Sequence, residues 1–263
     1  MQLRPELDEF TKDPSSRPNS PPILLNVGVT GHRSTVLTAP IVRSLRPAVY
    51  TVFSQIRGAA LRLQDPGAET CISEPRLHLH TALASGADQI AAICARSSGY
   101  FVRATLPFEA QEYRNDFAAG DELDMFEQAV AVADEVVALP GDRSDPEKAY
   151  VRVGKLLVRS ADIMIAIWDG ELGRGPGGTA HVVDLALRRS VPVIHIDIDH
   201  RSDNIRMRTL VRGGSAEQYS ESMSDPLLYN RVLSEVFQAK FDRGNRSTKS
   251  LPKSLKPRPI GAD

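Results

Sequence analysis

Hydrophobic residues follow two different patterns along the middle of this chain. Short apolar or alternating runs, typical of strands in a buried sheet, cover residues 23–29, 77–83, 101–106, 135–139, 163–168 and 191–196. Between them, apolar residues recur at steps of three and four, the spacing of one helix face, over residues 39–63, 87–96, 123–133, 146–160 and 180–189. This alternation predicts an α/β fold: a Rossmann-like, mostly parallel sheet of about six strands with helices on both faces.

The two ends of the chain differ from this middle part in composition. Residues 1–22 are rich in Pro, Ser and acidic residues and predict a disordered leader, and residues 243–263 are basic and rich in Pro and Ser and predict a disordered tail. We expect one folded domain over residues 23–200. Residues 201–242 are expected to form a polar loop followed by an amphipathic C-terminal helix near residues 227–241.

Composition narrows the class of protein. The length of 263 residues and the hydrophobic content of 41% allow one α/β domain with tails. The net charge of -1 gives no basic field for nucleic acid. Cys71 and Cys94 form no CxxC pattern, which indicates a reducing compartment. Without an 18-residue apolar run or a signal-type start, we expect a cytoplasmic protein with no transmembrane helix.

The most informative segment is glycine-rich and joins a predicted strand to a predicted helix. Gly175, Gly177, Gly178 and Thr179 follow the run at residues 163–168 and directly precede the helical run. The first amides of a helix have no intrahelical partner and carry the positive end of its dipole, and glycine lets an anion approach the backbone. The segment therefore predicts a phosphate seat, with a tight loop that holds no ligand as the alternative.

Polar residues at the ends of the other predicted strands should meet this loop, because parallel strands direct their following loops to one rim of the sheet. The expected ligand-binding residues there are Thr30, Gly31, His32, Arg33, Ser85, Gly86, Asp88, Phe108, Tyr113 and Trp168. Arg33 offers a fork of donors to a phosphate. Ser85 is expected to cap the next helix, and Asp88 either accepts hydrogen bonds from a ribose or base or complements the helix dipole. Phe108 stacks on a base or packs in the core. Together they predict a nucleotide site.

Four motifs occur in an order that resembles the SLOG superfamily, named for the Smf/DprA proteins and the LOG phosphoribohydrolases. They are the segments at residues 27–33, 85–88, 106–113 and 177–179, and the resemblance covers about residues 23–197. It implies a nucleotide-type ligand beside the glycine loop and a homo-oligomer. Some members are enzymes that cut the N-glycosidic bond of nucleoside monophosphates. Others resemble nucleotide sensors of bacterial conflict systems, which act on an effector protein, and DprA-like members bind single-stranded DNA.

The sequence departs from the enzyme pattern at one important position, and this difference favours binding over catalysis. LOG enzymes carry a glutamate three residues after the threonine of the glycine motif, and Val182 stands at that position here. Valine neither stabilises an oxocarbenium-like centre nor activates water. Asp184 lies in the wrong part of the helix, and His181 in its first turn is expected to be a polar cap residue.

We therefore expect a protein that binds, as a sensor, a nucleotide-derived small molecule without catalysis. The alternative is a LOG-like nucleoside 5'-monophosphate phosphoribohydrolase that uses Glu112, Asp88 or Asp169 in place of the missing glutamate. Single-strand binding of the DprA type is disfavoured by the net charge and by the aromatic content of 6%. The identity of the base and the number of phosphates stay open.

Metal chemistry has little support in the sequence. His78 and His80 share one face of a predicted strand, as do His195, Asp197 and Asp199. Neither set comes with paired cysteines or an HExxH pattern. We interpret both as polar residues of the core or surface and expect no metal cofactor, except a divalent ion that accompanies a phosphate ligand.

Overall fold

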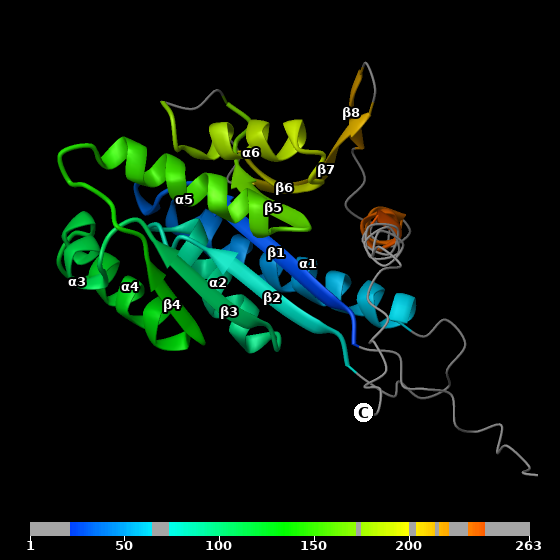
Figure 1. Cartoon of the computed structure of the whole chain (residues 1–263), viewed down its shortest axis with the longest axis horizontal. Helices are drawn as coiled ribbons and strands as arrows, with labels where there is room; N and C mark the ends of the chain where they lie inside the picture. The colour runs from blue at the N-terminus through cyan, green and yellow to red at the C-terminus, as the bar shows by residue number, and fades with distance from the viewer. Residues whose placement is uncertain are drawn as a thin grey trace, which may run out of the picture.

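The fold is a single β-sheet with helices on its two faces (Figure 1). The computed structural model describes residues 22–64, 74–171, 175–199, 204–213, 216–220 and 231–239. In these residues the sheet order is β4-β3-β2-β1-β5-β6-β7-β8. The strands are β1 (Leu24–Gly31), β2 (Arg76–Thr81), β3 (Phe101–Leu106), β4 (Glu135–Ala138), β5 (Ile163–Trp168), β6 (Val193–Asp199), β7 (Asn204–Gly213) and β8 (Ala216–Ser220). β1 to β6 are parallel, and β7 and β8 pair antiparallel at the end of the sheet.

The helices connect the strands and cover both faces of the sheet, so the predicted Rossmann-like α/β fold is confirmed. They are α1 (Ala39–Gln64), α2 (Ala87–Ser97), α3 (Ala110–Tyr113), α4 (Asp121–Val132), α5 (Pro146–Ser160) and α6 (Thr179–Arg188), with 3-10 turns η1 (Ser34–Val36) and η2 (Arg114–Asp116). α1, α2 and α4 lie behind the sheet in Figure 1, and α5 and α6 lie in front of it. Among the described residues, none of the helices combines the length and apolar character needed to cross a membrane.

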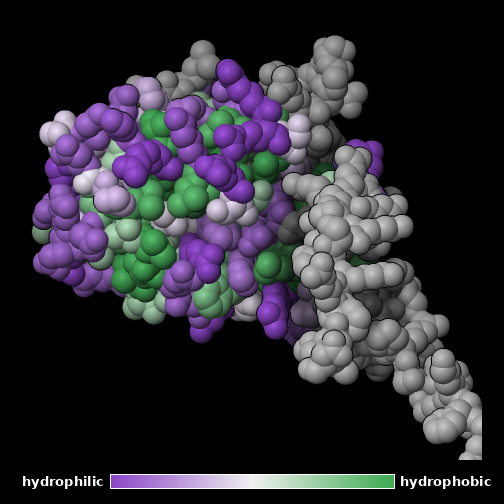
Figure 2. Space-filling model, viewed as in Figure 1, coloured by the Kyte–Doolittle hydropathy of each residue, from purple (hydrophilic) through white to green (hydrophobic). Residues whose placement is uncertain are grey.

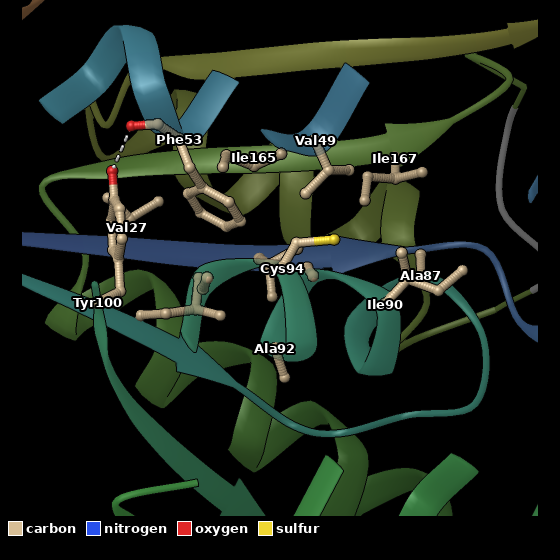
Figure 3. Packing of buried hydrophobic residues seen from close by; sticks show 14 of the residues in the cluster. Val27, Val49, Phe53, Ala87, Ile90, Ala92, Cys94, Tyr100, Ile165 and Ile167 are labelled. Carbon is tan, nitrogen blue, oxygen red and sulfur yellow. Dashed lines mark hydrogen bonds between the residues drawn. The ribbon is translucent and has the colours of Figure 1, made fainter. Parts of the chain in front are cut away.

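The main hydrophobic core lies between the sheet and α1 and α2 (Figure 3). Val27 of β1 and Ile165 of β5 pack there against Phe53 of α1, all three fully buried. Tyr100 is also fully buried in this core, and its hydroxyl donates a hydrogen bond to the Phe53 carbonyl at 3.0 Å. On the opposite face, Met164 packs in a second cluster with residues of α5 and α6.

The front face of β3 and β4 carries exposed side chains. Phe101 and Val137 are exposed there, beside an ion pair between Arg103 and Glu135. Figure 2 shows apolar patches between polar residues on this side of the molecule. In the part of the chain that the structure describes, α5 and α6 thus leave a portion of the sheet open.

The predicted polar loop at residues 201–242 is wrong over two segments. β7 pairs along β6, with Ile198 opposite Ile205, and β8 pairs along β7. The free edge of β6 offers backbone donors and acceptors, and a strand at the sheet margin needs no continuous apolar run to use them. The predicted C-terminal helix is helical over residues 231–239.

α1 runs unbroken from Ala39 to Gln64 with Pro47 inside it. Two other expectations concern the ends of the chain. Residues 1–21 of the predicted leader and the predicted tail at residues 243–263 lie outside the described residues. The division into domains stays a prediction.

Candidate ligand site

The sheet reverses its order of connection beside β1. From β1 the chain adds β2, β3 and β4 on one side, and it then crosses back to place β5 on the other side of β1. In open α/β sheets, the crevice at the carboxyl ends of the strands at such a switch point is where ligands bind. A cavity of about 740 Å³ lies there, which is within the range of small-molecule sites.

Most of the predicted ligand-binding residues line this one cavity. They are Thr30, Gly31, His32, Arg33, Asp88, Tyr113, Trp168, Gly175, Gly177, Gly178 and Thr179, together with the catalytic candidate Asp169. Tyr150, Val153 and Leu157 of α5, which the sequence patterns did not single out, also line it. They recur at helical spacing on one face of α5, a signal that identifies the face but not the cavity it borders.

Gly86 lies behind the cavity wall and serves packing. Its φ is 89°, and a Cβ on it would lie 2.5 Å from the Ser34 nitrogen and 2.7 Å from the Arg33 carbonyl carbon. The Ala87 amide donates to the His32 carbonyl at 3.0 Å. Gly86 thus allows the start of α2 to pack directly under the backbone that carries Arg33.

The predicted cap at Ser85 is wrong. Gly86 itself occupies the N-cap position of α2, without a side-chain cap hydrogen bond, so Ser85 is one residue too early to cap. The Ser85 hydroxyl instead accepts a hydrogen bond from the Ser34 hydroxyl at 3.3 Å. Ser85 therefore ties the start of α2 to η1.

Phe108 and Glu112 also lie away from the cavity lining. The Phe108 side chain is 1% exposed, and the guanidinium carbon of Arg143 lies 3.8 Å from the centre of its ring. Of the two expectations for Phe108, the structure therefore shows core packing. The Glu112 carboxylate pairs with Arg143 Nε at 3.1 Å. This pairing engages the carboxylate that the enzyme alternative would use as a base.

The glycine loop presents the start of α6 to the cavity. Gly177, with a φ of 83°, donates its backbone N–H to Nδ1 of His181 at 2.8 Å, so His181 is the polar cap residue that the sequence predicts. The first intrahelical hydrogen bond of α6 runs from the Val182 amide to the Gly178 carbonyl at 3.1 Å. Thr179 and Ala180 precede that bond and line the cavity, and the amides of a first helical turn are suited to an anion.

Arg33 supplies a positive side chain to the same cavity. It is the one arginine or lysine among the described residues that line the cavity. Its guanidinium carbon lies 5.7 Å from the centre of the Tyr150 ring, within the range of a cation–π contact. The cavity also has acidic side chains, including Asp88, Asp169, Glu147 and Glu171. Arg33 and the α6 amides are therefore the parts of the lining that favour a phosphate.

Asp88 is a buried carboxyl group at the β2 end of the cavity. It is 3% exposed, and it accepts hydrogen bonds from the Thr81 hydroxyl at 3.3 Å and from the backbone amides of Ala82 and Ala84. Burial raises the pKa of Asp88 to about 7, although these hydrogen bonds and Arg33 act in the opposite direction. Near neutral pH, Asp88 is thus able to donate or to accept a proton.

His32 and Asp169 join the ends of β1 and β5. His32 Nε2 lies 3.1 Å from the Asp169 carboxylate and 3.2 Å from the Asp169 amide nitrogen. One ring nitrogen cannot donate to the carboxylate and accept from the amide at the same time. Protonation of Nε2 selects the carboxylate contact, and its deprotonation selects the amide contact.

Val182 lines the cavity with a side chain that is 5% exposed. The position where LOG enzymes carry their glutamate therefore belongs to the cavity wall here but is apolar. Trp168 borders the same region, and its indole N–H donates to the Glu171 carbonyl at 2.9 Å. This hydrogen bond holds the indole in place beside the cavity.

The histidines weighed as metal ligands have other contacts. Burial lowers the pKa of His80 to about 4, and its Nε2 lies 3.1 Å from the Asn26 side-chain oxygen. His78 lies against Phe101, with ring centres 5.0 Å apart, and His195 Nε2 lies 2.8 Å from the Trp168 carbonyl. No group of three metal-ligating side chains occurs in the described residues.

Comparison with known proteins gives likenesses of fold. No protein-family model matches the chain, and no curated protein matches it. It is similar to DNA processing protein A (DprA) from Streptococcus pneumoniae, at 14% identity over 67% of this chain and 52% of that chain, with a TM-score of 0.43. The matched region thus spans about half of the pneumococcal protein.

Two further solved structures are similar. DprA from Helicobacter pylori, which binds single-stranded DNA, shows 11% identity over 80% of each chain with a TM-score of 0.43. The molybdenum cofactor carrier protein of Chlamydomonas reinhardtii shows 15% identity over 68% of this chain and 79% of that chain, with a TM-score of 0.38. In identity and in TM-score, all three structures are too distant to indicate a family or a function for this chain.

Proposed function

We propose that this protein binds a phosphate-bearing nucleotide or nucleotide-derived ligand in the crevice between β1 and β5, as a sensor that does not turn the ligand over. The observation that carries the proposal is the placement of Arg33 and the first turn of α6 along one cavity at the switch point of the sheet. The sensor role itself rests on the resemblance to the SLOG superfamily.

The lining supports a ligand with a phosphate and a less polar part. Gly178 and the amides of Thr179 and Ala180 suit the phosphate, and Arg33 adds a charge-assisted donor. Asp88 and Trp168 line the same cavity, and in this proposal Asp88 contacts a hydroxyl or N–H group and Trp168 a flat ring of the ligand. Val182 at the position of the LOG glutamate supports binding without hydrolysis.

Trp168 provides a direct test, because it is the one tryptophan of the chain and it lines the cavity. Its fluorescence is to be titrated with AMP, adenosine, inorganic phosphate, NAD and cyclic nucleotides. The proposal expects a saturable change with at least one phosphate-bearing compound, a much weaker response to adenosine, and recovery of the ligand intact. Equal fluorescence responses to adenosine and AMP would contradict the phosphate seat. No fluorescence response to any compound of the panel would contradict the whole proposal.

A LOG-like N-glycosidase is the second candidate, favoured by Asp88. A buried carboxyl with a pKa of about 7 in a cavity is suited to general acid or base catalysis at neutral pH. This function predicts release of free base from a nucleoside monophosphate, and loss of that release in Asp88→Asn with binding retained. If mass spectrometry detects no free base after incubation with nucleoside monophosphates, this function is excluded.

A further inference from the structure

Tyr150 touches both parts of the proposed phosphate seat. On one side, the guanidinium carbon of Arg33 lies 5.7 Å from the centre of its ring. On the other side, a Cβ placed on Gly177 would lie 3.1 Å from the Tyr150 Cβ, so the glycine loop packs closely against α5. Tyr150 lines the cavity between these two contacts.

Two charged residues hold Tyr150 from behind. Its hydroxyl donates a hydrogen bond to Oδ2 of Asp116, and Oδ1 of the same carboxylate accepts one from Nη1 of Arg143. Arg143 also pairs with Glu112 at 3.1 Å and lies on the Phe108 ring at 3.8 Å. We call Asp116 and Arg143 together the clamp.

The clamp is built to resist movement. The Asp116 side chain is only 12% exposed, so its pairing with Arg143 is screened less than a surface ion pair. Hydrogen bonds to a carboxylate are stronger than neutral ones. Burial raises the pKa of Tyr150, and the Asp116 charge adds to that rise, so the hydroxyl stays protonated and remains a donor. The ring that Arg33 contacts is therefore fixed in orientation.

We infer that Tyr150 is a positioning residue for the phosphate seat: the clamp fixes its ring, and the ring orients Arg33 toward the phosphate of the ligand. The inference rests on the proposed function. A preorganised arginine loses less side-chain freedom on binding, and this raises affinity without a new contact to the ligand. The effect of Tyr150 must then pass through Arg33 and must concern phosphate-bearing ligands.

The test is a double-mutant cycle with Tyr150→Phe and Arg33→Ala, measured as dissociation constants for AMP and adenosine by calorimetry. Tyr150→Phe keeps the ring and removes the hydroxyl, and with it the hydrogen bond to the clamp and the side-chain hydrogen bond with Arg33. We expect it to weaken AMP binding by about fivefold to tenfold, leave adenosine unchanged, and have no further effect once Arg33 is alanine. Asp116→Asn is a second route to the same loss.

Tyr100→Phe is the matched control, since it removes a buried hydroxyl that donates to the Phe53 carbonyl and that lies outside the cavity lining. It should lower the melting temperature and leave AMP affinity unchanged. Unchanged AMP affinity in both Tyr150→Phe and Asp116→Asn would overturn the inference alone, as would an equal loss in the Arg33→Ala background. Failure of the wild type to bind any phosphate-bearing compound of the panel would overturn the inference and the proposed function together.

Discussion

The two walls of the crevice are made in different ways. The glycine-loop wall consists of backbone within one short stretch, Gly175–Thr179, at the start of α6. The arginine wall consists of side chains, chiefly Arg33, Asp88 and Tyr150, that come from distant parts of the chain. A backbone wall is damaged by an added Cβ and by little else, whereas a side-chain wall depends on packing behind it. Variants of each wall should therefore fail in different ways.

We expect the largest loss of stability from Gly86→Ala, because this substitution disrupts the packing behind the arginine wall. Its positive φ and the 2.5 Å approach to the Ser34 nitrogen leave no room for a Cβ. We expect a loss of about 2–4 kcal/mol in the free energy of unfolding, since backbone strain of this kind costs about 1–3 kcal/mol before any steric clash. Urea denaturation measures the loss, and AMP affinity should fall with it.

Gly120→Ala is the matched control for this variant. Gly120 has a φ of 93° and caps α4, but a Cβ on it would meet no atom within 4 Å. Gly120→Ala should lower the free energy of unfolding only by the cost of backbone strain and should leave AMP affinity unchanged. An equal stability loss in both variants would show that the contact with the Arg33 backbone contributes nothing.

On the glycine-loop wall, Gly178→Val should abolish ligand binding and spare the fold. Gly178 has φ -77° and ψ 173°, which valine adopts readily, and the nearest atom to its Cβ position is the Gly175 carbonyl oxygen at 3.4 Å. We expect AMP affinity to fall by more than about a hundredfold, with a change in the free energy of unfolding below about 1 kcal/mol. Retained affinity in the calorimeter would place the phosphate elsewhere.

Arg33→Ala should have a smaller and more selective effect on binding. Loss of one charge-assisted hydrogen bond is worth about 1.5–3 kcal/mol, or roughly tenfold to a hundredfold in affinity. The loss should apply to AMP and not to adenosine, because adenosine has no phosphate. Equal weakening of both compounds would make Arg33 a structural residue of the wall.

A further effect concerns the pH dependence of the free energy of unfolding that Asp88 imparts. The folded protein keeps this proton up to a pH near 7, whereas the unfolded chain loses it near pH 3.8, the ordinary pKa of an aspartate. Between these values the folded state binds more protons, so the free energy of unfolding falls as pH rises.

Asp88→Asn should remove this fall. The gap between variant and wild type should shift in favour of the variant by an amount on the order of a few kcal/mol from pH 4 to pH 7, and then stay constant. Urea denaturation over that range measures the gap. Parallel profiles for the two proteins would mean that Asp88 titrates normally.

Much of the fold follows from the sequence because its signals are local. The period of apolar residues finds β1 to β6 and the larger helices within a few residues. The N-cap of α5 is local as well, since Asp145 accepts from the Lys148 amide at 3.2 Å. The topology rule then brings residues such as Arg33 and Gly178 to one rim without any knowledge of contacts. β7 was missed because its pairing is set by the free edge of β6 rather than by its own pattern.

The sequence does not reveal the clamp, for a similar reason. Asp116, Arg143 and Tyr150 lie in η2, in the loop before α5 and in α5, and no local period relates them. The sequence offers Glu112 as a candidate base but gives no sign of its pairing with Arg143. Such pairings between distant segments are decided by packing, which a single sequence does not display.

The central claim is that both walls together bind a phosphate-bearing ligand and release it unchanged. Native mass spectrometry of the wild type and Gly178→Val, incubated with nucleoside monophosphates, NAD and cyclic nucleotides, tests it most directly when bound ligand and free base are scored together. We expect the wild type to retain an intact nucleotide, Gly178→Val to lose it, and neither protein to produce free base. Retention that survives Gly178→Val, no retention at all, or accumulation of free base would contradict it.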